Sequence, residues 1–169
     1  MSNPVLYILL RQDMASMTPG RTAAMASHAT SVFDKEIIQL RIDDAREEMC
    51  AWLRANNTIT SKACKDLEGE FAPPENPQRE YLLGLYADWS LQASGFGTAI
   101  VLQADIPQIE QIIEEAQEMN LLAQAFRDPD YLIRDGRAVH SLDLPIGGYV
   151  FGEKDQLREL LGELPLLGS

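Results

Sequence analysis

The sequence predicts an α/β fold, because apolar strand-like runs alternate along it with helical patterns. The run Val5–Leu10 is uniformly apolar, which is typical of a buried strand. A second such run, Gly97–Ala104, is followed directly by an amphipathic helical pattern. With 169 residues, of which 46% are hydrophobic, the chain is long enough to bury one substantial core. We therefore expect a single domain over residues 1–169.

The first strand leads into a helix predicted from Thr18 to about Gln39. Thr18 is suited to cap its N-terminus and Pro19 to fill its first position. Arg21 and His28 lie on one face of this helix, since seven residues make about two turns. The helix N-terminus attracts phosphate or carboxylate, and Arg21 adds a full charge. Residues of these types are more often simply structural, so this face alone does not establish a site.

The second half of the chain contains the clearest helix, which opens at Asp105 or Ile106 and has Pro107 in its first turn. Its apolar residues recur on one face from Ile109 to Met119. Two further strands are predicted, the third at Leu121–Arg127, ending in Asp128-Pro129, and a short fourth at Tyr149–Phe151. Between them we expect a tight turn at Asp135-Gly136 and a loop at Asp143–Gly148. The last predicted element is a helix at Lys154–Leu161.

A helical insertion is predicted at about residues 34–96. It contains a charged helix at Asp43–Ala55 and the helix-breaking stretch Ala72–Pro77. Beyond that stretch, apolar and aromatic residues from Tyr81 to Trp89 recur at helical spacing. We favour the interpretation that this stripe packs on the sheet, and the alternative is a face that binds a protein partner.

Asp128 is a second candidate for a functional site, because it follows the predicted third strand. Acids at the carboxyl end of a strand lie where α/β sheets usually bind ligands. An aspartate before Pro129 equally fits the start of a turn. The residues alone favour neither role. His140 has no spacing to other residues that predicts a metal site.

The charge balance limits the choice of partners. A formal net charge of −12 and a pI near 4.5 oppose approach to a nucleic acid. The acidity is uneven, because residues 80–126 contain no lysine or arginine. Arginines flank the motifs described above, so a local basic pocket is compatible with the composition. They are Arg11, Arg21, Arg127, Arg134 and Arg137.

Cysteine usage and the N-terminal segment point to the cytoplasm. Cys50 and Cys64 form neither a metal-binding spacing nor a disulfide-rich pattern. The run Val5–Leu10 has no preceding basic region and is too short for a signal peptide or a membrane span. We expect a cytoplasmic protein without a membrane partner.

The order of these motifs resembles that of class II peptidyl-tRNA hydrolases, the archaeal and eukaryotic type. The similarity spans Val5 to about Phe33 and Gly97 to Leu167. In the first segment it consists of Arg11-Gln12-Asp13-Met14, Gly20-Arg21, Ala23-Ala24 and Ser27-His28-Ala29. In the second it consists of Gly97–Ala104, the amphipathic helix, Leu121–Asp128, Gly152 and Leu160–Leu166.

The resemblance implies a mixed four-stranded sheet with helices on both faces. It also implies hydrolysis of the ester that joins a peptide to the terminal ribose of tRNA, with no metal and no organic cofactor. The implied catalytic residues are Arg21, His28 and Asp128. The arginines expected to contact the RNA are Arg11, Arg127, Arg134 and Arg137.

Three positions depart from the family's pattern. Arg21 stands in place of its lysine, Met25 in place of its glutamine, and Asp130-Tyr131-Leu132 in place of glycine, a basic residue and threonine. The alternative function is therefore a noncatalytic acidic adaptor or inhibitor on the same fold. It would bind a protein through Trp52, Tyr81, Tyr86 and Trp89 of the insertion. A homodimer is left open.

Overall fold

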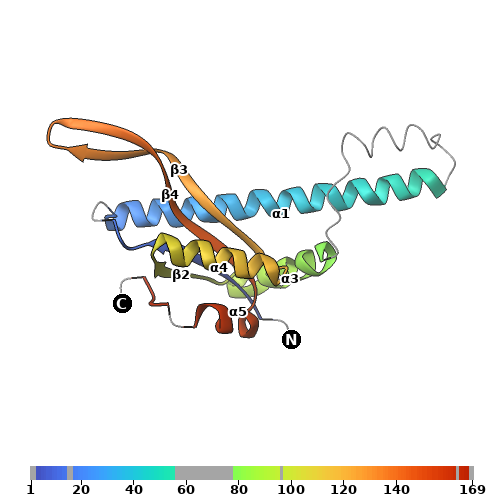
Figure 1. The fold of residues 1–169 in the computed structure, drawn as a ribbon. Coiled ribbons are helices and arrows are strands. Elements are labelled where there is room, and N and C mark those ends of the chain that lie inside the picture. Colours follow the sequence, from blue (N-terminus) through green and yellow to red (C-terminus); the bar gives the residue numbers. More distant parts are fainter. Residues whose placement is uncertain (1–2, 15–16, 56–77, 96, 163, 168–169) are drawn as a thin grey trace.

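The computed structural model describes residues 3–14, 17–55, 78–95, 97–162 and 164–167, and the chain forms an α/β fold (Figure 1). Four strands make one mixed sheet in the order β2-β1-β4-β3. Strand β1 pairs in parallel with β2, and β4 is antiparallel to both β1 and β3. The strands are β1 (Pro4–Arg11), β2 (Ala99–Ala104), β3 (Leu122–Asp135) and β4 (Ala138–Glu153).

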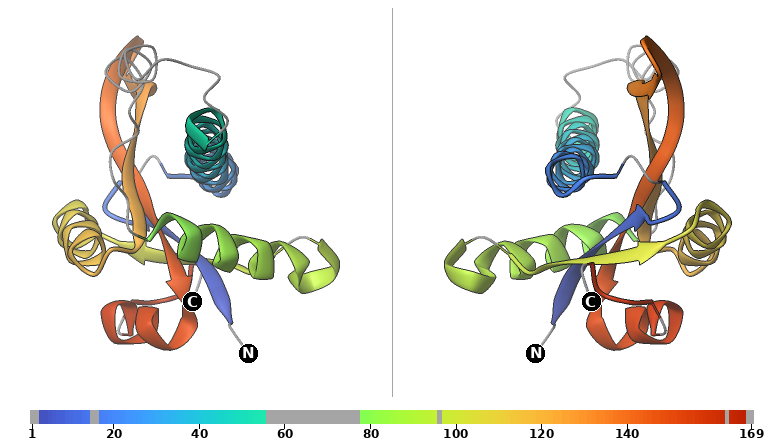
Figure 2. Two further views of the ribbon diagram at one scale, coloured as in Figure 1. Left: turned by 90° about the vertical axis from the view of Figure 1, so that its right-hand side faces the viewer. Right: turned by 90° about the vertical axis from the view of Figure 1, so that its left-hand side faces the viewer.

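Helices cover both faces of the sheet (Figure 2). Each face has its own apolar core. Helices α1 (Pro19–Ala55) and α3 (Arg79–Leu91) bury apolar side chains on one face, around Phe33 and Trp89. Helices α4 (Ile106–Glu118) and α5 (Lys154–Leu161) do so on the other, around Ile109 and Leu157. The expected mixed sheet of four strands, covered by helices, is therefore confirmed.

Helix α1 is one continuous helix of 37 residues, so the prediction of separate helices at Thr18–Gln39 and Asp43–Ala55 is wrong. Its start is as predicted, because the Thr18 hydroxyl accepts a hydrogen bond from the backbone N–H of Arg21. Asp43, which resembles a helix start in the sequence, is buried and accepts a hydrogen bond from the Gln39 side chain one turn earlier. The stretch Ala72–Pro77 lies outside the described residues.

Helix α3 confirms the interpretation that its apolar stripe packs on the sheet. Leu82, Leu85 and Trp89 are buried in the core shared with α1. Trp89 also donates a hydrogen bond from Nε1 to the carbonyl of Thr98, which precedes β2. Tyr86 is half-buried, and its ring lies 5.9 Å from that of Phe33. Trp89 is therefore a core residue, and Tyr86 packs against the same core.

Strands β3 and β4 are much longer than predicted and form a hairpin that projects from the body of the protein (Figure 1). The predicted end of the third strand at Asp128 is wrong, and so are the predicted loop at Asp143–Gly148 and the short fourth strand. These segments are paired strands in which two register shifts accommodate the extra residues. The turn at Asp135-Gly136 is as predicted, and Gly136 has the positive φ, +58°, that such a turn requires.

Helices α4 and α5 match the predictions closely. Asp105 caps α4 with a capping box, in which its side chain and that of Gln108 bond each other's backbone N–H groups. Helix α5 begins and ends at the predicted residues. Among the described residues, no helix combines the length and apolar character needed to cross a membrane.

Candidate functional site

The candidate site lies where the N-terminal half of α1 packs against β3. The rings of His28 on α1 and Phe126 on β3 lie 5.6 Å apart. Further along both elements, Arg21 donates a hydrogen bond from Nη1 to the hydroxyl of Tyr131, at 3.1 Å. Asp128 lies in β3 between these two contacts. The structure thus brings Arg21 and His28 onto the segment of β3 that contains Asp128.

Asp128 faces the same side of the hairpin as α1. It is opposite Leu144 in the pairing of β3 with β4, and directly paired residues point to the same face. Leu144 packs against the core that α1 covers. Asp128 follows Phe126 by two residues, across the register shift between Phe126 and Arg127. The carboxylate therefore lies on the face that contains His28.

The sequence left two roles open for Asp128, an acid at a ligand-binding position and the start of a turn, and the local structure has features of both. Asp128 is inside a strand and not at its carboxyl end, so the position predicted for it is wrong. Its Oδ1 accepts a hydrogen bond from the backbone N–H of Asp130 at 3.0 Å, across Pro129. This bond stabilises the bulge between Asp128 and Tyr131. Within the described residues the carboxylate makes no other hydrogen bond or ion pair.

Tyr131 is the residue of this site that the sequence did not reveal. Its side chain is buried, and the guanidinium of Arg21 lies over its ring at 4.9 Å. Arg21 also donates from Nη2 to the carbonyl of Leu132, at 2.8 Å. Three contacts thus fix the direction of one arginine. The sequence contains only a weak signal for this role of Tyr131, because aromatic residues are common in strands and no strand was predicted at this position.

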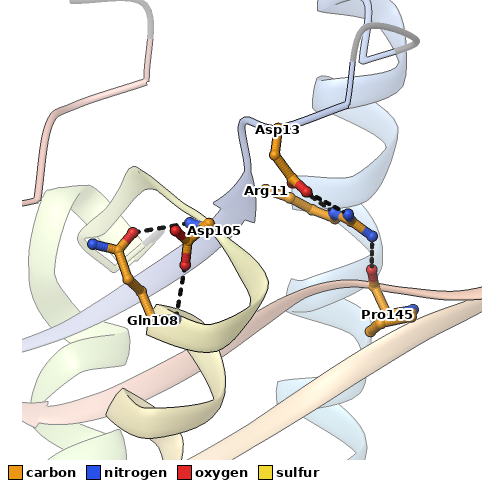
Figure 3. Close-up of polar contacts among 5 residues, drawn as sticks. All are labelled: Arg11, Asp13, Asp105, Gln108 and Pro145. Carbon is orange, nitrogen blue, oxygen red and sulfur yellow. Dashed lines mark hydrogen bonds and ion pairs between the residues drawn. The ribbon is translucent and has the colours of Figure 1, made fainter.

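Arg11 and Asp13 form a pair at the carboxyl end of β1 (Figure 3). The Nε and Nη2 atoms of Arg11 donate to the two carboxylate oxygens of Asp13, and Nη1 donates to the carbonyl of Pro145 in β4. These bonds lower the pKa of the Asp13 carboxyl below its ordinary value. The capping box of Asp105 and Gln108 lies at the adjoining end of β2, as Figure 3 shows. Arg11 therefore joins β1 to the hairpin at the edge where α/β sheets usually bind ligands.

The other arginines expected to contact RNA lie on the hairpin. Arg127 binds Asp143 across the strands, with its Nε 2.9 Å from Oδ1 and its Nη2 on the backbone carbonyl. Arg134 and Arg137 are exposed near the turn and form no ion pair within the part of the chain that the structure describes. The four arginines are thus of two kinds: Arg11 and Arg127 are bound to acids, while the two near the turn face solvent.

A carboxyl–phenol pair lies deeper on the same face of the sheet. The hydroxyl of Tyr149, in the part of β4 that lies between β1 and β3, donates a hydrogen bond to the carboxylate of Glu36 on α1. Burial raises the pKa of the Glu36 carboxyl above its ordinary value, although the bond from Tyr149 opposes this effect. Burial and the neighbouring carboxylate also raise the pKa of Tyr149. In the sequence Glu36 is indistinguishable from a solvated helix acid.

The described residues contain no group of three or more potential metal ligands. His140 is exposed in the outer part of β4, opposite Ile133. Cys50 is a free thiol on α1, and Cys64 lies outside the described residues. An open cavity of about 390 Å³ lies between α4 and α5, and its polar lining includes Gln108 and Arg158. It is on the opposite face of the sheet from Arg21 and His28.

No protein-family model matches the chain, and a search of curated proteins finds no match either.

Proposed function

We propose that the protein hydrolyses the ester bond of peptidyl-tRNA on the fold of class II peptidyl-tRNA hydrolases. The observation that carries the proposal is the convergence of Arg21, His28 and the Asp128 segment at the contact between α1 and β3. The mixed four-stranded sheet with helices on both faces agrees with the fold that the sequence resemblance implies.

Ester hydrolysis needs an activated water and stabilisation of the charge that develops on the carbonyl oxygen. Asp128 is assigned to the water, because its carboxylate has only one hydrogen bond within the described residues. Arg21 is assigned to the oxyanion or to a phosphate, since it is permanently protonated and cannot serve as a base. His28 orients the substrate. Water adds to the ester carbonyl, the bond to the ribose oxygen breaks, and the products are a peptide acid and a tRNA hydroxyl.

The hairpin provides the part of the site that reaches the RNA. Arg134 and Arg137 are exposed near its turn. Figure 1 shows that the tip of the hairpin extends away from helix α4. Both arginines are assigned to phosphate contacts. Arg11 and Arg127 have a supporting role in this proposal, because each already binds an aspartate. Because only Arg134 and Arg137 are assigned to phosphates on a chain with a net charge of −12, we expect weak RNA binding with a modest salt dependence.

The test is a hydrolysis assay on a model peptidyl-tRNA. Asp128→Asn and Arg21→Ala should each reduce kcat/KM by about 100-fold or more, as loss of a group that acts in the transition state does. Asp130→Asn is the matched control, because it changes a neighbouring exposed acid of the same bulge and should leave the rate within a few-fold. Equal activity in all these proteins would show that the site is misplaced.

The second candidate function is a noncatalytic adaptor or inhibitor that binds a protein through the insertion. Of its proposed contact residues, Trp52 is 60% exposed and Tyr81 is also exposed, whereas Trp89 is buried. The exposed residues favour this function and the buried one opposes it. An inactive wild-type protein at high concentration in the same assay would leave the adaptor as the better proposal.

A further inference from the structure

Helix α1 has an exposed apolar stripe on its outer face. The stripe consists of Ile38, Ile42, Ala45 and Met49. Ile38 is 56%, Ile42 41% and Met49 53% exposed, although these are the side chains that usually enter cores. At about 100° per residue the centre of the stripe lies about 130° around the helix from Phe33 and Ile37, which face the sheet. The helix is therefore apolar on two sides.

The spacing of the stripe is that of a coiled-coil seam. Its members are separated by four, three and four residues, which is the alternation of a and d positions in a heptad repeat. Trp52 continues the spacing by three more residues. A heptad repeat keeps its apolar residues facing a second helix along the whole contact. Apolar residues scattered singly over a surface do not recur at such a regular spacing. The occupant with the best geometrical fit is another α-helix.

The protein's own body contacts the other sides of this part of α1. Asp43 is buried, and Glu47 forms an ion pair with Arg79 of α3 at 2.6 Å. The guanidinium of Arg41 lies over the ring of Tyr86, at 5.1 Å. These contacts position α1 against α3 and leave the stripe facing outwards.

We propose that the stripe binds the same stripe of a second copy of this chain, with the two α1 helices antiparallel. In heptad terms Ile42 and Met49 are a positions and Ile38 and Ala45 are d positions. An antiparallel seam places Ile42 against Ala45 of the partner subunit, and Ile38 against Met49 of the partner subunit. Each copy thus fills the space beside the small Ala45 with a larger side chain.

The charges beside the stripe favour this direction. Arg41 and Glu48 both precede an a position, so they occupy g positions, and Arg46 occupies an e position. In an antiparallel pair g positions meet g positions, so Glu48 of the partner subunit comes near Arg41, whose guanidinium stays over the ring of Tyr86. The converse pair forms by symmetry. A parallel pair would instead place Arg41 beside Arg46 of the partner subunit. Like charges there oppose the parallel arrangement.

The first test is the sedimentation behaviour of the whole chain over a dilution series. Two heptads bury less surface than an obligate dimer does, so we expect a dimer that dissociates on dilution. Ile42→Asp should raise its dissociation constant by roughly tenfold or more, because it places a charge in the seam. Leu91→Asp is the matched control, since Leu91 is 79% exposed at the end of α3, and it should leave association unchanged. A monomer at every concentration, or a dimer unaffected by Ile42→Asp, would overturn the proposal.

The second test determines the direction of the helices. In a chain with Cys50→Ser and Cys64→Ser, the single variants Ile42→Cys and Ala45→Cys are prepared separately, mixed and oxidised. The antiparallel seam predicts a disulfide between the two different variants as the main product. Disulfides formed mainly within each variant alone would show a parallel pair and refute the proposed arrangement.

Discussion

The contact between Arg21 and Tyr131 should contribute measurably to the docking of α1 on the hairpin. Tyr131→Phe keeps the aromatic ring under the guanidinium and removes only the hydroxyl that accepts from Nη1. Hydrogen bonds to charged groups contribute about 1.5–3 kcal/mol to stability. Arg21 is only half-buried, so solvent screens its charge and we expect a contribution at the lower end of this range. We therefore expect Tyr131→Phe to lower the free energy of unfolding by about 1.5 kcal/mol.

A double-mutant cycle in urea denaturation isolates this contact. Arg21→Ala removes the same hydrogen bond, so combining it with Tyr131→Phe should cost about 1 kcal/mol less than the sum of the single changes. Arg46→Ala is the control partner, because it lies on the distal half of α1 and should be additive with Tyr131→Phe. A coupling below about 0.3 kcal/mol between Arg21 and Tyr131 would refute the inference that they join helix and hairpin.

Three further predictions concern stability. Gly97→Ala should cost roughly 2–5 kcal/mol in thermal or urea unfolding, because Gly97 has φ +70° and a Cβ there would lie 2.3 Å from the ring of Trp89. Gly136→Ala, with φ +58° and open space around it, should cost only about 1–2 kcal/mol, and equal losses would contradict the steric explanation. Asp105→Ala should cost about 1 kcal/mol through loss of the α4 cap, measured in the same way, and no change would show that the cap is unimportant. Because burial raises the folded-state pKa of Glu36, its contribution to stability is full below its ordinary pKa of 4.5 and is lost as pH rises through the raised pKa. Glu36→Gln should therefore gain stability relative to wild type as the pH rises above 4.5, and parallel pH profiles would contradict this.

The parts of the fold that follow from local patterns were predictable. The strand Val5–Leu10 and helices α4 and α5 have apolar periodicity, caps or both, and the structure places them where the sequence does. The outer hairpin was not predictable in this way. Beyond the pair of Leu10 with Gly147, β3 and β4 pair only with each other, so neither face shows a clean alternation of apolar and polar residues. Pro129 and Pro145 add turn signals that the register shifts accommodate inside the strands.

The candidate site was only partly predictable for the same reason. Arg21 and His28 share a helix face, and helical spacing alone is enough to infer this. Their contact with Phe126 and Tyr131 depends on the direction of the hairpin, which no local pattern indicates. The same applies to Glu36, because its burial depends on Tyr149, a residue far along the chain.

The central position of β1 has a consequence for the way the protein is made. Leu6 pairs with Ala99 on one side and with Phe151 on the other, so the first strand to be synthesised pairs only with strands far along the chain, one of which is the last to be made. At about 5–20 residues per second, the ribosome needs roughly 10 s or more to reach β4. Until β4 is synthesised, β1 lacks one of its neighbouring strands. The sheet-facing side of α1 then lacks the complete sheet that it covers. Protection of the nascent chain by chaperones should therefore matter more for this protein than for one whose central strands pair with near neighbours.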